Sequence, residues 1–111
     1  MENIISRRLT MTAEQTIFFN ELANIQDYCV NVSLCKKEEY KNLEELLIDA
    51  TSEVIYRIME VFDGYGDNLA RCNIVSTASG EVINETIQLH DKCVEYLKNI
   101  WLFLRPAMRN V

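Results

Sequence analysis

The residues whose types could support chemistry lie in two short stretches, an acidic turn and the region around the single histidine. The turn Asp63-Gly64-Tyr65-Gly66-Asp67-Asn68 combines two carboxylates with two glycines, and His90 is followed by Asp91. Carboxylates and imidazoles bind divalent cations and transfer protons. If neighbouring helices bring the stretches together, Asp63, Asp67, His90 and Asp91 form an acidic rim that can bind a small molecule or a divalent metal ion.

Neither stretch completes a known ligand-binding motif. A calcium-binding EF-hand loop starting at Asp63 would have Tyr65 at its third position, Asn68 where glycine is required, and Ile74 at position twelve. The two glycines of the turn also fail as a dinucleotide-binding fingerprint, because Leu69 replaces the third glycine and a helical pattern precedes them. The turn is therefore interpreted as the end of a helix.

The cysteines do not indicate a metal site or a nucleophile. None of the four forms a Cys-x-x-Cys pair. His90 and Cys93 share a helical face, but zinc would need two more ligands, and a nucleophilic pair would need an activated thiol and an oxyanion site. The sequence therefore predicts no cofactor and favours a protein without enzymatic activity. With no leader pattern and no disulfide framework, we expect a cytoplasmic protein.

A run of acidic residues suggests a protein-binding surface. Between residues 38 and 53 there are six acidic side chains against Lys41 alone, a local net charge of −5. Glu45, Asp49 and Glu53 stand four residues apart, where like charges oppose helix formation. Such repulsion is tolerable if the face meets a basic partner, although a solvated face remains the alternative. The predicted partner-binding residues are Glu38, Glu45, Asp49, Glu53, Trp101 and Phe103.

Composition limits the remaining possibilities. The 111 residues carry a net charge of −6, which disfavours nucleic-acid binding, and no apolar run approaches the ~20 residues that cross a bilayer. We expect a flexible N-terminal arm over residues 1–11 and a single globular domain over residues 12–111.

Periodicity predicts two long helices in the first half of the chain. Thr12 and Gln15 match a capping box, so a helix starts there and reaches a short connection at Val30–Cys35. A second helix begins near Lys36, and its amphipathic part runs from Leu43 to Phe62.

The second half of the chain changes pattern. Leu69 to Asn84 predicts a β-hairpin, with Gly80 supplying a positive φ in its loop. Asn84 then caps a third helix that ends at Pro106. The expected fold is α+β and predominantly α: a three-helix antiparallel bundle with a β-hairpin between the second and third helices. Residues 100–104 are apolar all round, which indicates burial or an interface, including a possible homodimer.

Two functional classes follow from these patterns. The favoured one is a small non-enzymatic domain of the inhibitor, immunity or regulatory type, whose acidic helical face binds a basic protein. The alternative is a small-molecule or divalent-metal-binding protein that uses the rim of Asp63, Asp67, His90 and Asp91.

Overall fold

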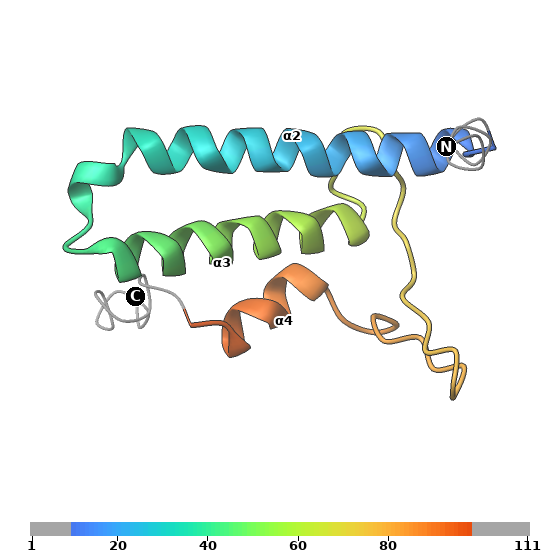
Figure 1. Ribbon diagram of the computed structural model, residues 1–111. Helices are drawn as coiled ribbons and strands as arrows, with labels where there is room; N and C mark the ends of the chain where they lie inside the picture. The colour runs from blue at the N-terminus through green and yellow to red at the C-terminus, as the bar shows by residue number, and fades with distance from the viewer. Residues whose placement is uncertain (1–9, 99–111) are drawn as a thin grey trace.

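Three α-helices joined by irregular segments make up the part of the chain that the computed structural model describes, residues 10–98 (Figure 1). Helix α3 lies between α2 and α4 and packs against both, and α2 and α3 run antiparallel (Figure 1).

Helix α2 spans Ala13–Cys35 and starts as the sequence predicts. Gln15 N donates to Thr12 Oγ1 over 3.1 Å, and Thr12 N donates to Gln15 Oε1 over 2.8 Å, which completes the capping box. The predicted connection at Val30–Cys35 is wrong, because the helix continues through it. That stretch contains no glycine or proline, and its β-branched residues lower helix propensity by only a few tenths of a kcal/mol each.

Helix α3 spans Leu43–Phe62, as the amphipathic pattern predicts, although not from Lys36. The short 3-10 helix η1, Lys37–Glu39, occupies part of the connection from α2. Asn42 caps α3 by accepting a hydrogen bond from Glu45 N over 2.9 Å. At the opposite end of the helix pair, the rings of Phe18 and Phe62 lie 5.6 Å apart and fix α2 against α3.

The predicted β-hairpin is wrong, and with it the α+β assignment, because residues 10–98 contain no β-strand. The pairing there is a single antiparallel bridge between Val75 and Val82. Its extension is blocked by Asn84, whose side-chain oxygen, not a backbone carbonyl, accepts from Ile74 N over 2.9 Å. Gly80 does adopt a positive φ of 77° at the loop. The described fold is all-helical.

Helix α4 spans Leu89–Tyr96, so the predicted start at Asn84 is wrong. Asn84 cannot cap a helix because its buried amide already binds Ile74 N and Cys72 O. The predicted continuation to Pro106 is also wrong, because α4 ends at Tyr96 and the backbone of Leu97 is extended. Residues beyond Lys98 lie outside the described part.

The described helices bury few apolar side chains completely. Only Cys29, Val61 and Leu89 are buried apolar residues among residues 10–98. Many large apolar side chains stay exposed instead: Phe19, Tyr28, Val30, Leu34, Leu43, Leu47, Ile55, Tyr65, Val75, Ile83, Val94 and Tyr96 among them. No helix in the described range is long and apolar enough to span a membrane. Such apolar exposure on a small folded chain marks surfaces that contact other groups.

Two glycines with positive φ give a first prediction. A Cβ at Gly64 (φ 96°) would lie 3.2 Å from Arg71 N, whereas a Cβ at Gly80 (φ 77°) would meet nothing within 4 Å. We expect Gly80→Ala to cost about 1 kcal/mol from the backbone alone, and Gly64→Ala about 2 kcal/mol because crowding adds to it. Urea unfolding of both variants measures the difference. Equal losses would mean that the loop after α3 moves aside freely.

Candidate functional site

Asp63, at the C-cap of α3, joins α3 to α4. Its side chain is fully buried and accepts three hydrogen bonds: from Leu89 N over 2.9 Å, from His90 N over 2.8 Å and from His90 Nδ1 over 2.5 Å. The His90 ring stands edge-on to the rings of Tyr56 and Tyr65, at 5.5 and 5.2 Å. Burial by itself would raise the pKa of Asp63, but the hydrogen bonds from His90 and Leu89 outweigh it and lower that pKa.

The predicted acidic rim is thus brought together only in part. Asp91 lies 3.5 Å from His90 Nε2, whereas Asp67 lines a separate pocket of about 140 Å³ with Glu21 and Arg57. Within residues 10–98, no three His, Cys, Asp or Glu side chains are grouped closely enough to hold a metal ion. The oxygens of Asp63 face the N-terminus of α4, so this carboxylate acts as a helix cap.

The predicted acidic face on α3 is largely engaged within the chain. Asp49 accepts from Lys36 Nζ over 3.2 Å and from the hydroxyl of Tyr40. Burial would lower the pKa of Lys36, but its hydrogen bond to Asp49 and the charge of that carboxylate raise it. Glu53 Oε1 pairs with Arg57 over 3.0 Å.

The remaining predicted partner-binding residues differ in their surroundings. Glu45 Oε1 accepts from Lys41 N over 2.9 Å at the start of α3. Glu38 is exposed in η1. Trp101 and Phe103 lie outside the described residues. Of the predicted acidic residues, Glu38 is the one whose side chain is exposed and has no ion pair with another described residue.

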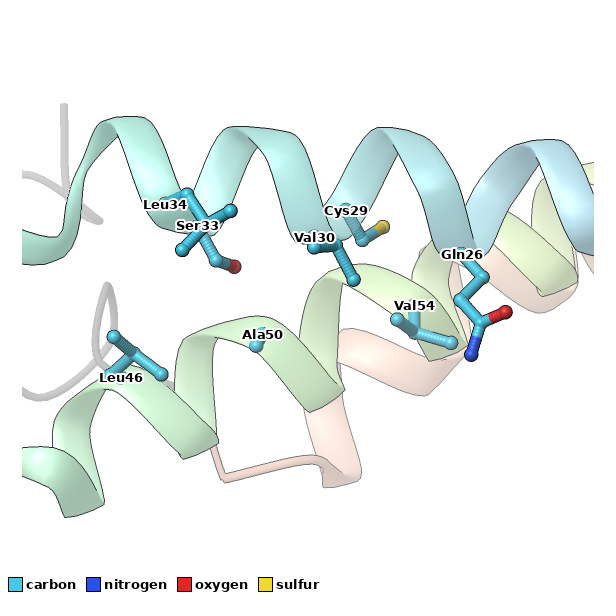
Figure 2. Close-up of a pocket in the computed structure, with 8 residues that line it drawn as sticks. All are labelled: Gln26, Cys29, Val30, Ser33, Leu34, Leu46, Ala50 and Val54. Carbon is cyan, nitrogen blue, oxygen red and sulfur yellow. The ribbon is translucent and has the colours of Figure 1, made fainter.

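The structure adds a feature that the sequence analysis did not single out, an apolar groove between α2 and α3. Figure 2 shows its lining side chains, which come from both helices and point into the space between them. The groove has a volume of about 350 Å³, in the range of pockets that hold small apolar groups. Its lining residues are Gln26, Cys29, Val30, Ser33, Leu34, Leu46, Ala50 and Val54.

Two rows of residues with helical spacing build this groove. Leu46, Ala50 and Val54 stand four residues apart on α3, and the small Ala50 leaves room in the middle of its row. On α2 the corresponding row is Gln26, Val30 and Leu34. The α3 row belongs to the amphipathic pattern that predicted the helix from Leu43 to Phe62. The α2 row was missed because Val30 was assigned to a connection.

The groove holds one buried thiol and exposed apolar side chains. Cys29 is its buried member, at 3% exposure. Burial and the nearby charge of Glu53 raise the pKa of the Cys29 thiol, which keeps it in the unreactive neutral form. Val30 and Leu34 are 51% and 59% exposed, so their apolar surface is available to a ligand. Covering such a side chain is worth up to about 1.5–3 kcal/mol.

Comparisons of this chain with protein-family models, with curated proteins and with solved structures found no match.

Proposed function

We propose that this protein is a non-enzymatic protein-binding domain that captures a basic amphipathic helix in the groove between α2 and α3. The observation that supports the proposal is the groove itself: two mostly apolar rows, one from each helix, with exposed Val30 and Leu34 at its edge. An apolar surface of this kind is unfavourable in water and becomes stabilising when a partner covers it.

The spacing of the rows favours a helical partner. Val54 lies eight residues after Leu46, or about 12 Å along α3 at 1.5 Å per residue. That length matches two turns of a helix, whose apolar side chains at positions i, i+4 and i+7 can enter between the rows. Gln26 and Ser33 supply polar groups at the groove that can fix the orientation of the partner.

The charge of the protein favours a basic partner. Residues 10–98 contain seven Lys and Arg against 16 Asp and Glu, a net charge of −9. Exposed Glu38, Glu39 and Glu44 lie on η1 and the first turn of α3, at the end of the helix pair where Leu34 and Leu46 line the groove. Complementary charge speeds encounter and disfavours acidic competitors. The groove thus replaces the Asp49 and Glu53 face as the centre of the binding surface, since those two carboxylates already have partners.

The alternative metal-binding function gains less support. A metal ion at the rim would have to compete with three hydrogen bonds for the oxygens of Asp63. Breaking them would also uncap α4, so that site carries no second proposal.

Two synthetic helical peptides test the proposed function. Both carry Leu at positions i, i+4 and i+7, and they differ only in having Lys or Glu elsewhere. We expect the 111-residue chain to bind the Lys peptide at least about tenfold more tightly than the Glu peptide in calorimetry. Val30→Lys should weaken binding of the Lys peptide by about tenfold or more, because it puts a charge into the apolar edge of the groove.

Val75→Lys provides the matched control. Val75 is 50% exposed, like Val30 at 51%, but lies in the segment between α3 and α4, away from the groove. It should leave binding unchanged. Equal affinity for both peptides, or binding that survives Val30→Lys intact, would contradict the proposed function.

A further inference from the structure

A second pocket, here called the acidic pocket, lies between α2 and the end of α3 and is not used by the proposed function. Its volume is about 140 Å³, below the about 300–1,000 Å³ of drug-sized sites and suited to a small group. Its charged lining residues are Glu21 from α2, Arg57 and Glu60 from α3, and Asp67 from the turn that follows α3. Three carboxylates against one guanidinium give the pocket a net charge of −2.

The guanidinium of Arg57 is held by groups other than Glu21. Its Nη2 lies 3.0 Å from Glu53 Oε1, and its Nη1 lies 3.3 Å from Glu60 Oε1. The same guanidinium lies over the ring of Tyr28, 5.0 Å from the ring centroid. The donors of Arg57 are therefore engaged along α3, and Glu21 forms no ion pair with any residue between 10 and 98.

Glu21 itself points to a ligand. The residue is only 7% exposed, and its Oε1 accepts a hydrogen bond from Asn68 N over 3.0 Å. Its Oε2 accepts no hydrogen bond from the described residues, although Glu21 lines the pocket. A buried carboxylate without a cationic partner is costly, and buried charges in proteins are as a rule paired. A cation in the acidic pocket would supply the missing partner.

Gly66 keeps the pocket open beside Glu21. Its φ is not positive, in contrast to the φ of 96° at Gly64, so the backbone does not require glycine at this position. A Cβ at position 66 would lie 3.4 Å from Val61 Cγ2 and 3.5 Å from Glu21 Oε1. Glycine therefore leaves room for a group that approaches the carboxylate of Glu21.

The arrangement favours an ammonium group over a metal ion. In the part of the chain that the structure describes, no three His, Cys, Asp or Glu side chains are close enough together to hold a metal ion. A primary ammonium has three N–H donors on a compact charge, as many donors as the pocket has carboxylates. The alkyl part of an amine can lie against Ile25 and Val61, which also line the pocket.

We propose that the acidic pocket binds the primary ammonium group of an alkylamine, with Glu21 as its anchor. The group can belong to a free small amine or to a lysine side chain of a bound protein, because the same N–H donors and charge are recognised in both. This inference goes beyond the proposed function: it concerns a different site and stands whether or not the groove binds a helix.

Ethylammonium is the probe, followed by amide NMR of the 111-residue chain at constant ionic strength. We expect the amide signals of Gly66 and Asn68 to shift saturably, since Asn68 N donates to Glu21. Tetramethylammonium, which has the charge but no N–H donor, should bind at least about tenfold more weakly.

Glu21→Gln keeps an oxygen that can accept from Asn68 N but removes the charge. It should raise the Kd for ethylammonium about tenfold or more. Glu14→Gln, the same substitution at an exposed position of α2, should leave this Kd unchanged. Gly66→Ala gives a second variant with the charge intact, and it should raise the Kd about threefold or more because its methyl group occupies space beside Glu21.

Equal binding of ethylammonium and tetramethylammonium would overturn the ammonium site, as would a Kd that neither Glu21→Gln nor Gly66→Ala changes. Saturable shifts of the same amides with calcium chloride and not with ethylammonium would also overturn it and would assign the pocket to a metal ion. If the site binds ethylammonium as expected, the Lys peptide identifies the source of the group. Displacement of ethylammonium by this peptide assigns the pocket to a lysine side chain of a partner, and undisturbed binding assigns it to a free amine.

Discussion

Replacing Asp63 with asparagine should destabilise the protein by about 3 kcal/mol and detach α4 from α3. The buried carboxylate accepts from the backbone amides of Leu89 and His90 and from the His90 ring. Asparagine has one acceptor oxygen, so its amide group would face a backbone donor. Losing an N-cap costs about 0.5–2 kcal/mol and losing a hydrogen bond to a charged group about 1.5–3 kcal/mol. Urea unfolding and amide exchange in α4 measure the loss.

The pH dependence of this variant follows from the lowered pKa of Asp63. A carboxyl whose pKa is lower in the folded than in the unfolded state stabilises the fold above its unfolded pKa of about 3.9, and this stabilisation is lost as pH falls toward the folded pKa. The stability difference between wild type and Asp63→Asn should therefore be largest near pH 7 and shrink below about pH 4. Asp67→Asn, an exposed change in the same turn, should show neither effect. A difference that stays constant with pH would refute the role of the ionised carboxylate.

The helical elements were predictable where local signals agreed. Thr12 and Gln15 fixed the start of α2, and the apolar period of Leu43–Phe62 matches the observed α3, although the helix was predicted to begin near Lys36. The pattern between α3 and α4 was misleading, because β-branched residues beside a glycine loop are typical of a hairpin. Whether strands extend depends on which groups satisfy the backbone, and here the side chain of Asn84 does so. A contact between residues 84 and 74 leaves no local trace in a sequence.

The site was predictable in its residue types but not in their partners. The sequence located Asp63 and His90 at one end of the helices, and the structure makes them a cap, because the N-terminus of α4 begins at Leu89 and not at Asn84. Asp49 looked free because Lys36 approaches it only through the folding of the chain. The pairing of Glu53 with Arg57 follows from their separation of one helical turn. Predicting the groove would require knowing how α2 is positioned along α3, and the periodicity of a single helix does not specify this.

The second large effect concerns Asn84, a polar residue whose backbone and side chain together have no exposed surface. Its amide group donates to Cys72 O over 2.8 Å while its oxygen accepts from Ile74 N, so one side chain holds both a donor and an acceptor of the same backbone stretch. Arg71 also donates to the Asn84 backbone carbonyl. These bonds fold residues 69–84 into a closed loop without a sheet.

Asn84→Asp keeps the shape of this side chain but removes its donor. The carboxylate can still accept from Ile74 N, yet it faces the carbonyl oxygen of Cys72 and carries a charge at a site with no exposed surface. Leaving a buried polar group unsatisfied costs about 1–3 kcal/mol, and more for a charge, so we expect a loss of about 2–3 kcal/mol.

Hydrogen exchange tells whether that loss comes from the loop. In the loop, the amide of Ile74 donates to Asn84 Oδ1, and the amide of Ile83 donates to Ile74 O. Both amides should exchange at least about tenfold faster in Asn84→Asp. Amides within α2 should follow only the global change in stability. Asn73→Asp, the same substitution at an exposed position of the same segment, should leave the rates at Ile74 and Ile83 nearly unchanged. If both variants behave alike, added negative charge and not the lost donor disturbs the loop, and Asn84 does not hold it closed.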